Sequence, residues 1–214
     1  MPILEEKDRV KVKEILTKGM ESGVKLVVFS QEFECDFCKE TRLLAEELAG
    51  LHPMLDVENY DLQRDSKVAS EYEVEKIPAI VVTGDGGRGV RYFGIPSGYE
   101  FSGLLDDIID VSRRSTRLTD EIADRVRKID RDVHIQVFVT PTCPYCPRAV
   151  RTAHQMAMLN SRIKADMVES MEFPELANRY GVMAVPKIVI NEKVSFEGAL
   201  PDAQFLEEVL KAVA

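Results

Sequence analysis

The sequence contains no tryptophan and only three histidines. It also has no apolar run that approaches the roughly 18 residues a membrane-spanning helix needs. Its first residues, MPILEEKDRVK, lack the basic region and apolar stretch that mark a signal peptide. These absences predict a protein that has no membrane span or membrane partner and that works in the cytoplasm.

No long Ser- or Pro-rich linker or low-complexity tract divides the 214 residues, and no basic stripe is interleaved with aromatic residues. The net charge of -9 is spread over segments of mixed sign, which argues against nucleic acid as a partner. Hydrophobic residues make up 45% and charged residues 30% of a chain longer than one typical domain. We therefore expect two modest domains, each with its own core.

Amide side chains are scarce, with four Asn and five Gln, whereas Glu, Lys and Arg are abundant. This composition is typical of proteins from hot environments and predicts a thermophile source. The prediction bears on the cysteines, because the cytosol of hyperthermophiles can be rich in disulfides whereas ordinary cytosol keeps thiols reduced.

The four cysteines form two C-x-x-C pairs, one in FECDFCKE (Cys35 and Cys38) and one in TCPYCPR (Cys143 and Cys146). In a chain without an export signal, two such pairs do not indicate a framework of structural disulfides. Redox chemistry and metal binding both remain open at this point.

A repeat connects the two pairs. The first cysteines lie 108 positions apart (35 to 143), and each is followed after 43 positions by a proline, Pro78 in IPAIVV and Pro186 in VPKIVI. A repeat of this length indicates duplicated domains rather than a solenoid. The boundary falls near 113–116 and predicts domains 1–115 and 116–214.

The apolar periodicity is the same in both halves. Apolar, β-branched runs at 25–29 and 134–139 directly precede the cysteine loops and predict buried strands. Helical patterns follow the cysteines and end at Gly50 and Asn160, and both residues suit a left-handed helix cap. The remaining expected elements are opening helices at 5–21 and 117–129, strands at 54–60 and 163–168, short helices at 64–73 and 172–180, hairpins with turns at 83–89 and 190–193, and closing helices at 97–112 and 201–213. This order predicts an α/β fold in which each domain has a mixed sheet of about four strands with helices on both faces.

The cysteines sit where a strand turns into a helix. The first cysteine is expected at the helix N-terminus, where unpaired N–H groups and the helix dipole stabilise a thiolate. Cys143 and Cys35 are therefore the candidate nucleophiles toward a disulfide. Cys146 and Cys38, three positions on, are placed to attack the first sulfur and release the bound partner.

The residues between the cysteines differ in charge. Pro144 is predicted at the first helical position and adds no charge. Asp36 is anionic and has Glu32 and Glu34 close by in sequence, and carboxylates disfavour a second negative charge. The sequence therefore predicts that Cys143 is the more acidic thiol.

The strand–CxxC–helix unit with a proline opening a later strand resembles the thioredoxin/glutaredoxin fold, and CPYC is similar to the glutaredoxin motif. Two such units, each with CxxC, resemble the protein disulfide oxidoreductases of hyperthermophiles over nearly the whole chain. The resemblance implies an enzyme that reduces, forms or rearranges disulfides of client proteins. It also implies that no cofactor is bound and that electrons come from NAD(P)H through a thioredoxin-reductase-type flavoenzyme.

The resemblance further assigns Pro78 and Pro186 as the cis-prolines that face the cysteines. The backbone at Ile77 and Val185 would then pair with an extended client segment. Two departures matter. Leu26 and His134 lie nine residues before the cysteines, where thioredoxins carry a buried acid, so the proton carrier is not identified. The sequences TPTCPYC and AVP do not match a glutathione site.

Two other functions fit parts of the sequence. A dedicated electron carrier between a flavin reductase and a peroxidase is one, as in the tandem thioredoxin-fold module of alkyl hydroperoxide reductase flavoproteins, although that module usually keeps only one CxxC. A binding or chaperone module that holds zinc through its cysteines is the other, and it would require both pairs to converge on one ion.

Overall fold

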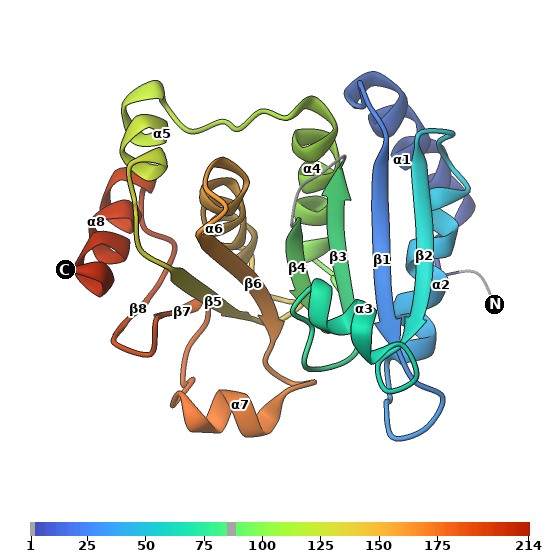
Figure 1. Ribbon diagram of the computed structural model, residues 1–214. Helices are drawn as coiled ribbons and strands as arrows, with labels where there is room; N and C mark the ends of the chain where they lie inside the picture. Colours follow the sequence, from blue (N-terminus) through green and yellow to red (C-terminus); the bar gives the residue numbers. More distant parts are fainter. Residues whose placement is uncertain (1–2, 85–88) are drawn as a thin grey trace. The chain divides into compact units, whose positions relative to one another are not determined.

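The computed structural model describes residues 3–84 and 89–214 (Figure 1). The chain divides into two compact units. The first unit consists of Met1–Ile95 with Leu104–Ser115, and the second of Pro96–Gly103 with Thr116–Ala214. Residues 96–103 thus group with the second unit although they precede the predicted boundary at 115 and 116. A membrane crossing would need a longer and more apolar helix than any in the described residues.

The first unit has a mixed four-stranded sheet in the order β2-β1-β3-β4. Strand β1 runs parallel to β2 and antiparallel to β3, and β3 and β4 form a hairpin. The elements are α1 (Glu6–Gly19), β1 (Val24–Ser30), α2 (Cys38–Ala49), β2 (Leu55–Asp61), α3 (Ser66–Glu71), β3 (Ala79–Gly84), β4 (Val90–Phe93) and α4 (Glu100–Arg113), of which the first four residues group with the second unit.

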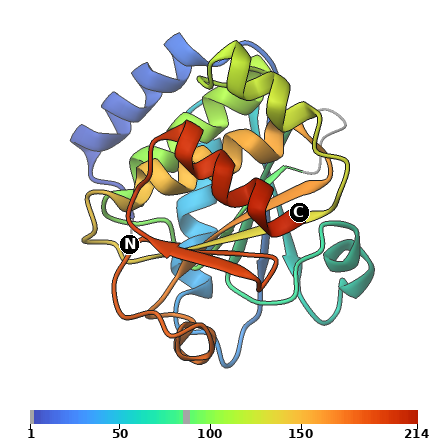
Figure 2. The same cartoon turned by 90° about the vertical axis from the view of Figure 1, so that its left-hand side faces the viewer.

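The second unit repeats this topology with the strand order β6-β5-β7-β8. Strand β5 is parallel to β6 and antiparallel to β7, and β7 and β8 form a hairpin. The elements are α5 (Asp120–Arg127), β5 (Val133–Val139), α6 (Cys146–Leu159), β6 (Ile163–Glu169), α7 (Pro174–Arg179), β7 (Lys187–Ile190), β8 (Val194–Glu197) and α8 (Asp202–Val213). Figures 1 and 2 show α8 and α7 on opposite sides of the β7–β8 hairpin.

The core of each unit is built on its central strand. In β1 the four residues 26–29 are fully buried, and in β5 Ile135, Val137, Phe138 and Val139 are fully buried. A strand covered on both faces reads as a continuous apolar run, and this is why the sequence revealed these two strands clearly. In the second unit Phe205 of α8 packs edge-on against Phe196 of β8, with ring centroids 5.3 Å apart.

The predicted α/β fold class and the element order are confirmed. The predicted turn at 83–89 includes residues 85–88, which lie outside the described residues. In the second hairpin, Asn191 and Glu192 adopt positive φ angles of 51° and 57° and form the turn. The expectation of left-handed helix caps is wrong: Gly50 has φ -65°, and Asn160 is extended with φ -142°. Asn160 instead donates from its side-chain amide to the carbonyl oxygens of Val126 and Ile129.

Candidate active sites at two disulfide loops

Each CxxC pair forms a disulfide between the end of a central strand and the start of a helix. Cys35 and Cys38 connect β1 to α2, and Cys143 and Cys146 connect β5 to α6, with a Cα–Cα distance of 5.5 Å in both pairs. The structure therefore brings together each pair of predicted catalytic cysteines, one pair in each unit.

The second cysteine of each pair is the first helical residue, so each helix starts after the first cysteine, and α6 starts two positions after Pro144. The first cysteine nevertheless faces the helix end, because the backbone N–H of Cys146 donates to Cys143 Sγ at 3.2 Å. This N–H has no partner within its own helix and can stabilise a thiolate on Cys143.

The predicted helical position of Pro144 is wrong. Helix α6 begins at Cys146, so Pro144 lies in the preceding turn, and Pro147 occupies the first turn of the helix instead. A proline suits this place because its missing N–H would have no partner within the helix. The sequence CPYCP contains both prolines, and only the position of the helix start decides between them.

Burial differs between the two cysteines of each pair. Cys38 is 2% exposed and Cys146 is fully buried, whereas Cys35 is half-buried and Cys143 is 7% exposed. A partner disulfide therefore meets the first cysteine before the second. Exposed apolar side chains belong to the same loops, Phe37 in the first pair and Tyr145 in the second.

The two predicted docking prolines both follow cis peptide bonds, Ile77-Pro78 and Val185-Pro186. In the second unit this segment faces the disulfide, because the carbonyl oxygen of Val185 lies 3.7 Å from Cys143 Sγ. The carbonyls of the prolines accept hydrogen bonds from Gly94 at 2.9 Å and Gly198 at 2.8 Å, which ties each proline segment to the end of its hairpin.

The loop before the first cysteine is one residue longer in the first unit than in the second. Strand β1 ends at Ser30, five positions before Cys35, whereas β5 ends at Val139, four positions before Cys143. Glu34, in the longer loop, has a positive φ of 56°. Positions counted back from the cysteines therefore do not correspond between the strands.

Leu26 and His134 both lie nine residues before a first cysteine, but because of this difference in loop length they do not occupy equivalent positions in their strands. By strand pairing, His134 corresponds to Lys25, and each side chain pairs with an acid on the adjacent parallel strand. Lys25 Nζ lies 2.5 Å from Glu58, and His134 Nε2 lies 2.6 Å from Asp166. Both pairs bridge the two parallel strands of their unit.

A pocket of about 360 Å³ lies beside the first disulfide. Besides Cys35 and Cys38, its lining includes three cationic side chains, two of them from α2 and one from the loop after β2: Lys39, Arg42 and Arg64. Sequence reasoning missed this group, because it considered only the acidic residues next to Cys35 along the chain. The signal was present, since Lys39 and Arg42 are three apart on a predicted helix and share one face.

The surroundings of the second disulfide contain different residues at the equivalent positions. The repeat of 108 residues places Pro147 at the position of Lys39, Val150 at that of Arg42 and Glu172 at that of Arg64. Val150 is fully buried, and none of the three is cationic. The two sites therefore share cysteines and proline segments but differ in charge.

The acids at the ends of β2 and β6 also differ in their surroundings. Glu169 at the end of β6 is 3% exposed, and burial raises its pKa, although backbone N–H groups of Glu172 and Met171 partly oppose this. Its Oε1 has no hydrogen-bond partner among the described residues. The equivalent Asp61 accepts backbone hydrogen bonds from Arg64 and Gln63, which lower its pKa.

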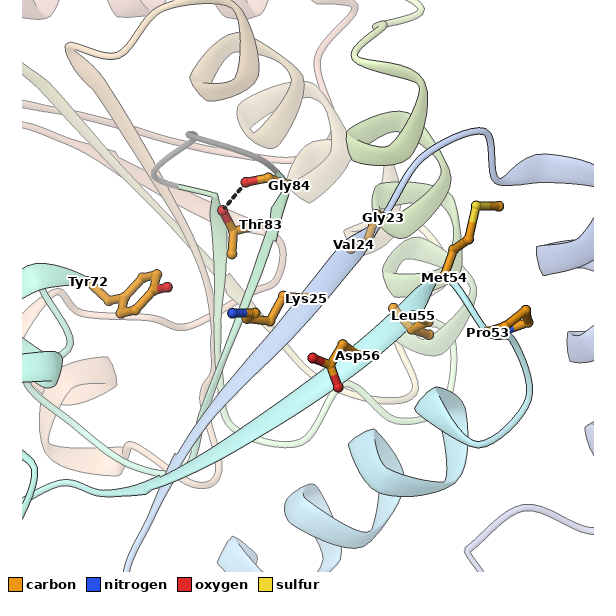
Figure 3. A pocket seen from close by; sticks show the side chains of 10 residues that line it. All are labelled: Gly23, Val24, Lys25, Pro53, Met54, Leu55, Asp56, Tyr72, Thr83 and Gly84. Carbon is orange, nitrogen blue, oxygen red and sulfur yellow. Dashed lines mark hydrogen bonds between the residues drawn. The ribbon is translucent and has the colours of Figure 1, made fainter.

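A second pocket of the first unit, about 780 Å³, lies away from the cysteines (Figure 3). Its walls are the starts of β1 and β2 and the end of β3, and Lys25, Asp56 and Thr83 are among the lining residues. Cys35 follows the opposite end of β1. This pocket therefore does not belong to the disulfide site.

In residues 3–84 and 89–214, no group of three or more His, Cys, Asp and Glu side chains is arranged to hold a metal ion. The two cysteine pairs each close on themselves as disulfides. The zinc-holding alternative, which requires both pairs around one ion, therefore finds no site in the described part of the chain.

A family model for the thioredoxin domain matches residues 133–211. Among solved structures, a protein disulfide oxidoreductase from Aeropyrum pernix is 33% identical, with a TM-score of 0.88 over 96% of this chain and 91% of that one. The alkylhydroperoxide reductase component AhpF from Enterococcus faecalis matches with the same TM-score of 0.88 at 24% identity, over 96% of this chain and 99% of that one. This second match supports the fold.

Curated relatives are longer proteins. A NADH dehydrogenase from Bacillus subtilis is 28% identical over 83% of this chain and 32% of its own length. The AhpF component of alkyl hydroperoxide reductase from Staphylococcus aureus is 29% identical over 73% of this chain and 28% of its own length. The chain thus spans about a third of these relatives.

Proposed function

The chain belongs to the protein disulfide oxidoreductase family, and from this membership we propose that it catalyses thiol–disulfide exchange on client proteins through both CxxC pairs. One observation carries the proposal: each unit places a CxxC disulfide between the end of a central strand and the start of a helix. Cys35 and Cys143 are the proposed nucleophiles, and Cys38 and Cys146 the resolving cysteines.

The proposed reaction proceeds in two exchanges. The Cys143 thiolate attacks one sulfur of a client disulfide, which forms a mixed disulfide and releases the other client sulfur as a thiolate. The Cys146 thiolate then attacks Cys143 Sγ and releases the second client sulfur. Two electrons pass from the enzyme dithiol to the client disulfide, and the two protons given up by the enzyme convert the client thiolates to thiols. The reverse sequence oxidises a client dithiol.

We assign the docking of the client to the segments Ile77-Pro78 and Val185-Pro186. The position of the Val185 carbonyl, 3.7 Å from Cys143 Sγ, supports this assignment because an extended client segment paired there would hold its sulfur at the nucleophile. Hydrogen exchange in a mixed disulfide trapped on a Cys146→Ser variant tests it. The amide of Val185 should exchange more slowly than in the free variant, and an unchanged rate would contradict this role.

We further propose that electrons reach the chain from NAD(P)H through a thioredoxin-reductase-type flavoenzyme, with no cofactor on the chain itself. The names of the relatives, NADH dehydrogenase and alkyl hydroperoxide reductase, support a partner of the reductase class. The cytoplasm is the proposed location, because the reaction needs such a supply of reducing equivalents.

A dedicated electron carrier is the second candidate, and the similarity to AhpF of alkyl hydroperoxide reductase favours it. A carrier would pass electrons to one peroxidase and would not act on unrelated disulfide proteins. The two CxxC pairs favour the broader activity, because a relay to one partner needs only one dithiol.

Insulin reduction driven by dithiothreitol and refolding of scrambled ribonuclease test the proposed function. Wild type, Cys35→Ser, Cys143→Ser and the double variant are compared in both assays. We expect wild type to be active, each single variant to retain the contribution of the other site, and the double variant to match dithiothreitol alone. Wild type that does no better than dithiothreitol would reject general exchange and favour the carrier.

A further inference from the structure

The two exchange steps proposed above do not use the cationic pocket beside the first disulfide. We propose that it binds an acidic segment of the protein partner, next to the partner cysteine that exchanges with Cys35. The inference rests on the proposed function and adds a partner chemistry to one of the two sites. It follows from three observations: where the cations lie, how little they are paired, and their replacement in the second unit.

The three cations come from two separate elements that line the same pocket as the disulfide. Lys39 and Arg42 lie one turn apart on α2, directly after Cys38, and Arg64 comes from the loop between β2 and α3. All three side chains are exposed. A carboxylate that enters this pocket therefore meets donors from both elements while it lies beside the sulfurs.

These cations are little used within the protein. In the described part of the chain, the side chains of Lys39 and Arg64 form no ion pair, and Arg42 approaches Glu46 at 3.8 Å with both side chains more than 40% exposed. Exposed ion pairs of this kind contribute little to stability. The cations are therefore available to a ligand, and the fold does not explain why they are there.

The same pocket contains two acids, which limit what it can attract. Asp61 uses its Oδ1 to accept backbone N–H groups of Gln63 and Arg64, and Glu32 lies in the exposed loop before Cys35. Three cations against two acids leave a small positive excess. This excess stands out because the chain as a whole carries a net charge of -9.

The second unit provides the internal comparison. Its equivalents of the three cations are Pro147, Val150 and Glu172, so an acidic segment finds no cation at those positions. Both sites have a CxxC disulfide and a cis-proline segment, so we expect the preference for acidic partners, which depends on the three cations, at the first site only. Guanidinium groups bind carboxylates through paired hydrogen bonds, which makes two of the three cations well suited to Asp and Glu.

The experiment measures the rate at which one reduced site reduces synthetic disulfide peptides. A Cys143→Ser/Cys146→Ser variant isolates the first site, and three peptides of equal length carry Glu, Gln or Lys on both sides of the disulfide. At low salt the acidic peptide should react roughly five- to ten-fold faster than the basic one, at about two-fold per cation. The ratio should fall with added salt, because exposed charges are screened.

The variant Lys39→Gln/Arg42→Gln/Arg64→Gln should bring the ratio of acidic to basic peptide close to one. The substitutions also change the electrostatic environment of the cysteines and hence the rate with every peptide. The ratio of the two rates cancels this common change, and the rate with the Gln peptide measures it. The matched control removes three exposed lysines of the first unit that do not line the pocket, Lys11→Gln/Lys13→Gln/Lys67→Gln. This control should keep the preference.

The second site, isolated by Cys35→Ser/Cys38→Ser, should show no preference for the acidic peptide. The proposal is overturned if the first site reduces all three peptides equally, or if the control triple variant loses the preference as fully as the pocket variant. If neither site reduces the Gln peptide faster than the background reaction, the proposed function itself fails, and this outcome is distinct from equal rates at the first site.

Discussion

The two disulfide sites are built alike but have different surroundings. Both place the second cysteine at the first residue of a helix, and each unit has a proline segment with a cis peptide bond. The first opens onto a pocket with Lys39, Arg42 and Arg64, whereas the equivalent positions of the second hold no cation. The two sites therefore share the geometry for thiol–disulfide exchange. We propose that the residues around each disulfide determine which partners it accepts. Four sets of variants probe this difference, in order of decreasing effect.

The largest effect concerns the shared chemistry. Cys38→Ser and Cys146→Ser should each stop turnover at their own site, a loss of about 100-fold or more, because the mixed disulfide can no longer be resolved. Mass spectrometry should find the client attached to Cys35 in the first variant and to Cys143 in the second. A client attached to the second cysteine of either pair in the wild type would contradict the assigned roles.

The cross-strand pairs should differ in their contribution to stability. His134→Gln removes a partner of Asp166, whose side chain is 1% exposed, and should lower the free energy of unfolding by about 1–3 kcal/mol. Lys25→Gln breaks a pair whose side chains are 37% and 34% exposed and should cost about 0.2–1 kcal/mol. Urea unfolding of the two variants measures the loss of unfolding free energy in each. Equal losses would contradict the view that the buried acid makes the His134 pair the more stabilising one.

A transplant of charge tests whether the pocket cations are sufficient. Pro147→Lys/Glu172→Arg introduces two of the three cations into the second site, and its ratio of acidic to basic peptide should rise about two- to four-fold. The measurement uses the variant that lacks Cys35 and Cys38. Val150 is left unchanged, because a charge at this fully buried position would destabilise the unit. No rise in the ratio would mean that the pocket shape, and not its charge, selects the partner.

The smallest effect concerns the two acids at the strand ends, and its sign differs between them. Burial raises the pKa of Glu169, so its stabilising contribution is present below the unfolded pKa of about 4.3 and is lost as pH rises through the raised value. Backbone hydrogen bonds lower the pKa of Asp61, so its contribution is present above about pH 3.9 and is lost as pH falls through the lowered value.

Denaturant unfolding between acidic and neutral pH should therefore give opposite trends. Relative to wild type, Glu169→Gln should gain stability as pH rises, and Asp61→Asn should lose stability as pH rises. Parallel trends for the two variants would contradict the opposite directions of the two pKa shifts.

Much of this fold followed from the sequence because its signals are local and occur twice. The structure contains the two central strands that the apolar runs at 25–29 and 134–139 predicted. It also contains the duplicated topology that the spacing of cysteines and prolines predicted. The helix start at Cys146 did not follow, since CPYCP is compatible with either proline in the first turn of the helix. The one-residue difference in the loop at Glu34 was hidden, because the cysteines themselves keep an exact repeat of 108.

The surroundings of the first disulfide were the hardest feature to predict. Glu32, Glu34 and Asp36 are near Cys35 in sequence and indicated an acidic site. Arg64 reaches the same pocket from a loop beyond β2, and only the parallel pairing of β1 with β2 brings it there. Whether Cys143 is the more acidic thiol stays a prediction, and the pocket cations oppose it. Thiolate absorbance, measured against pH on the two variants that each keep one site, decides whether Cys35 or Cys143 has the lower pKa.

The proposed chemistry requires both CxxC pairs to be reversible dithiol–disulfide couples. The most direct test equilibrates wild type in dithiothreitol redox buffers, labels free thiols and quantifies each cysteine by mass spectrometry. We expect two complete transitions, one in which Cys35 and Cys38 are oxidised together and one in which Cys143 and Cys146 are. A pair that stays reduced or stays oxidised across the buffers, or that retains zinc when reduced, would contradict this chemistry.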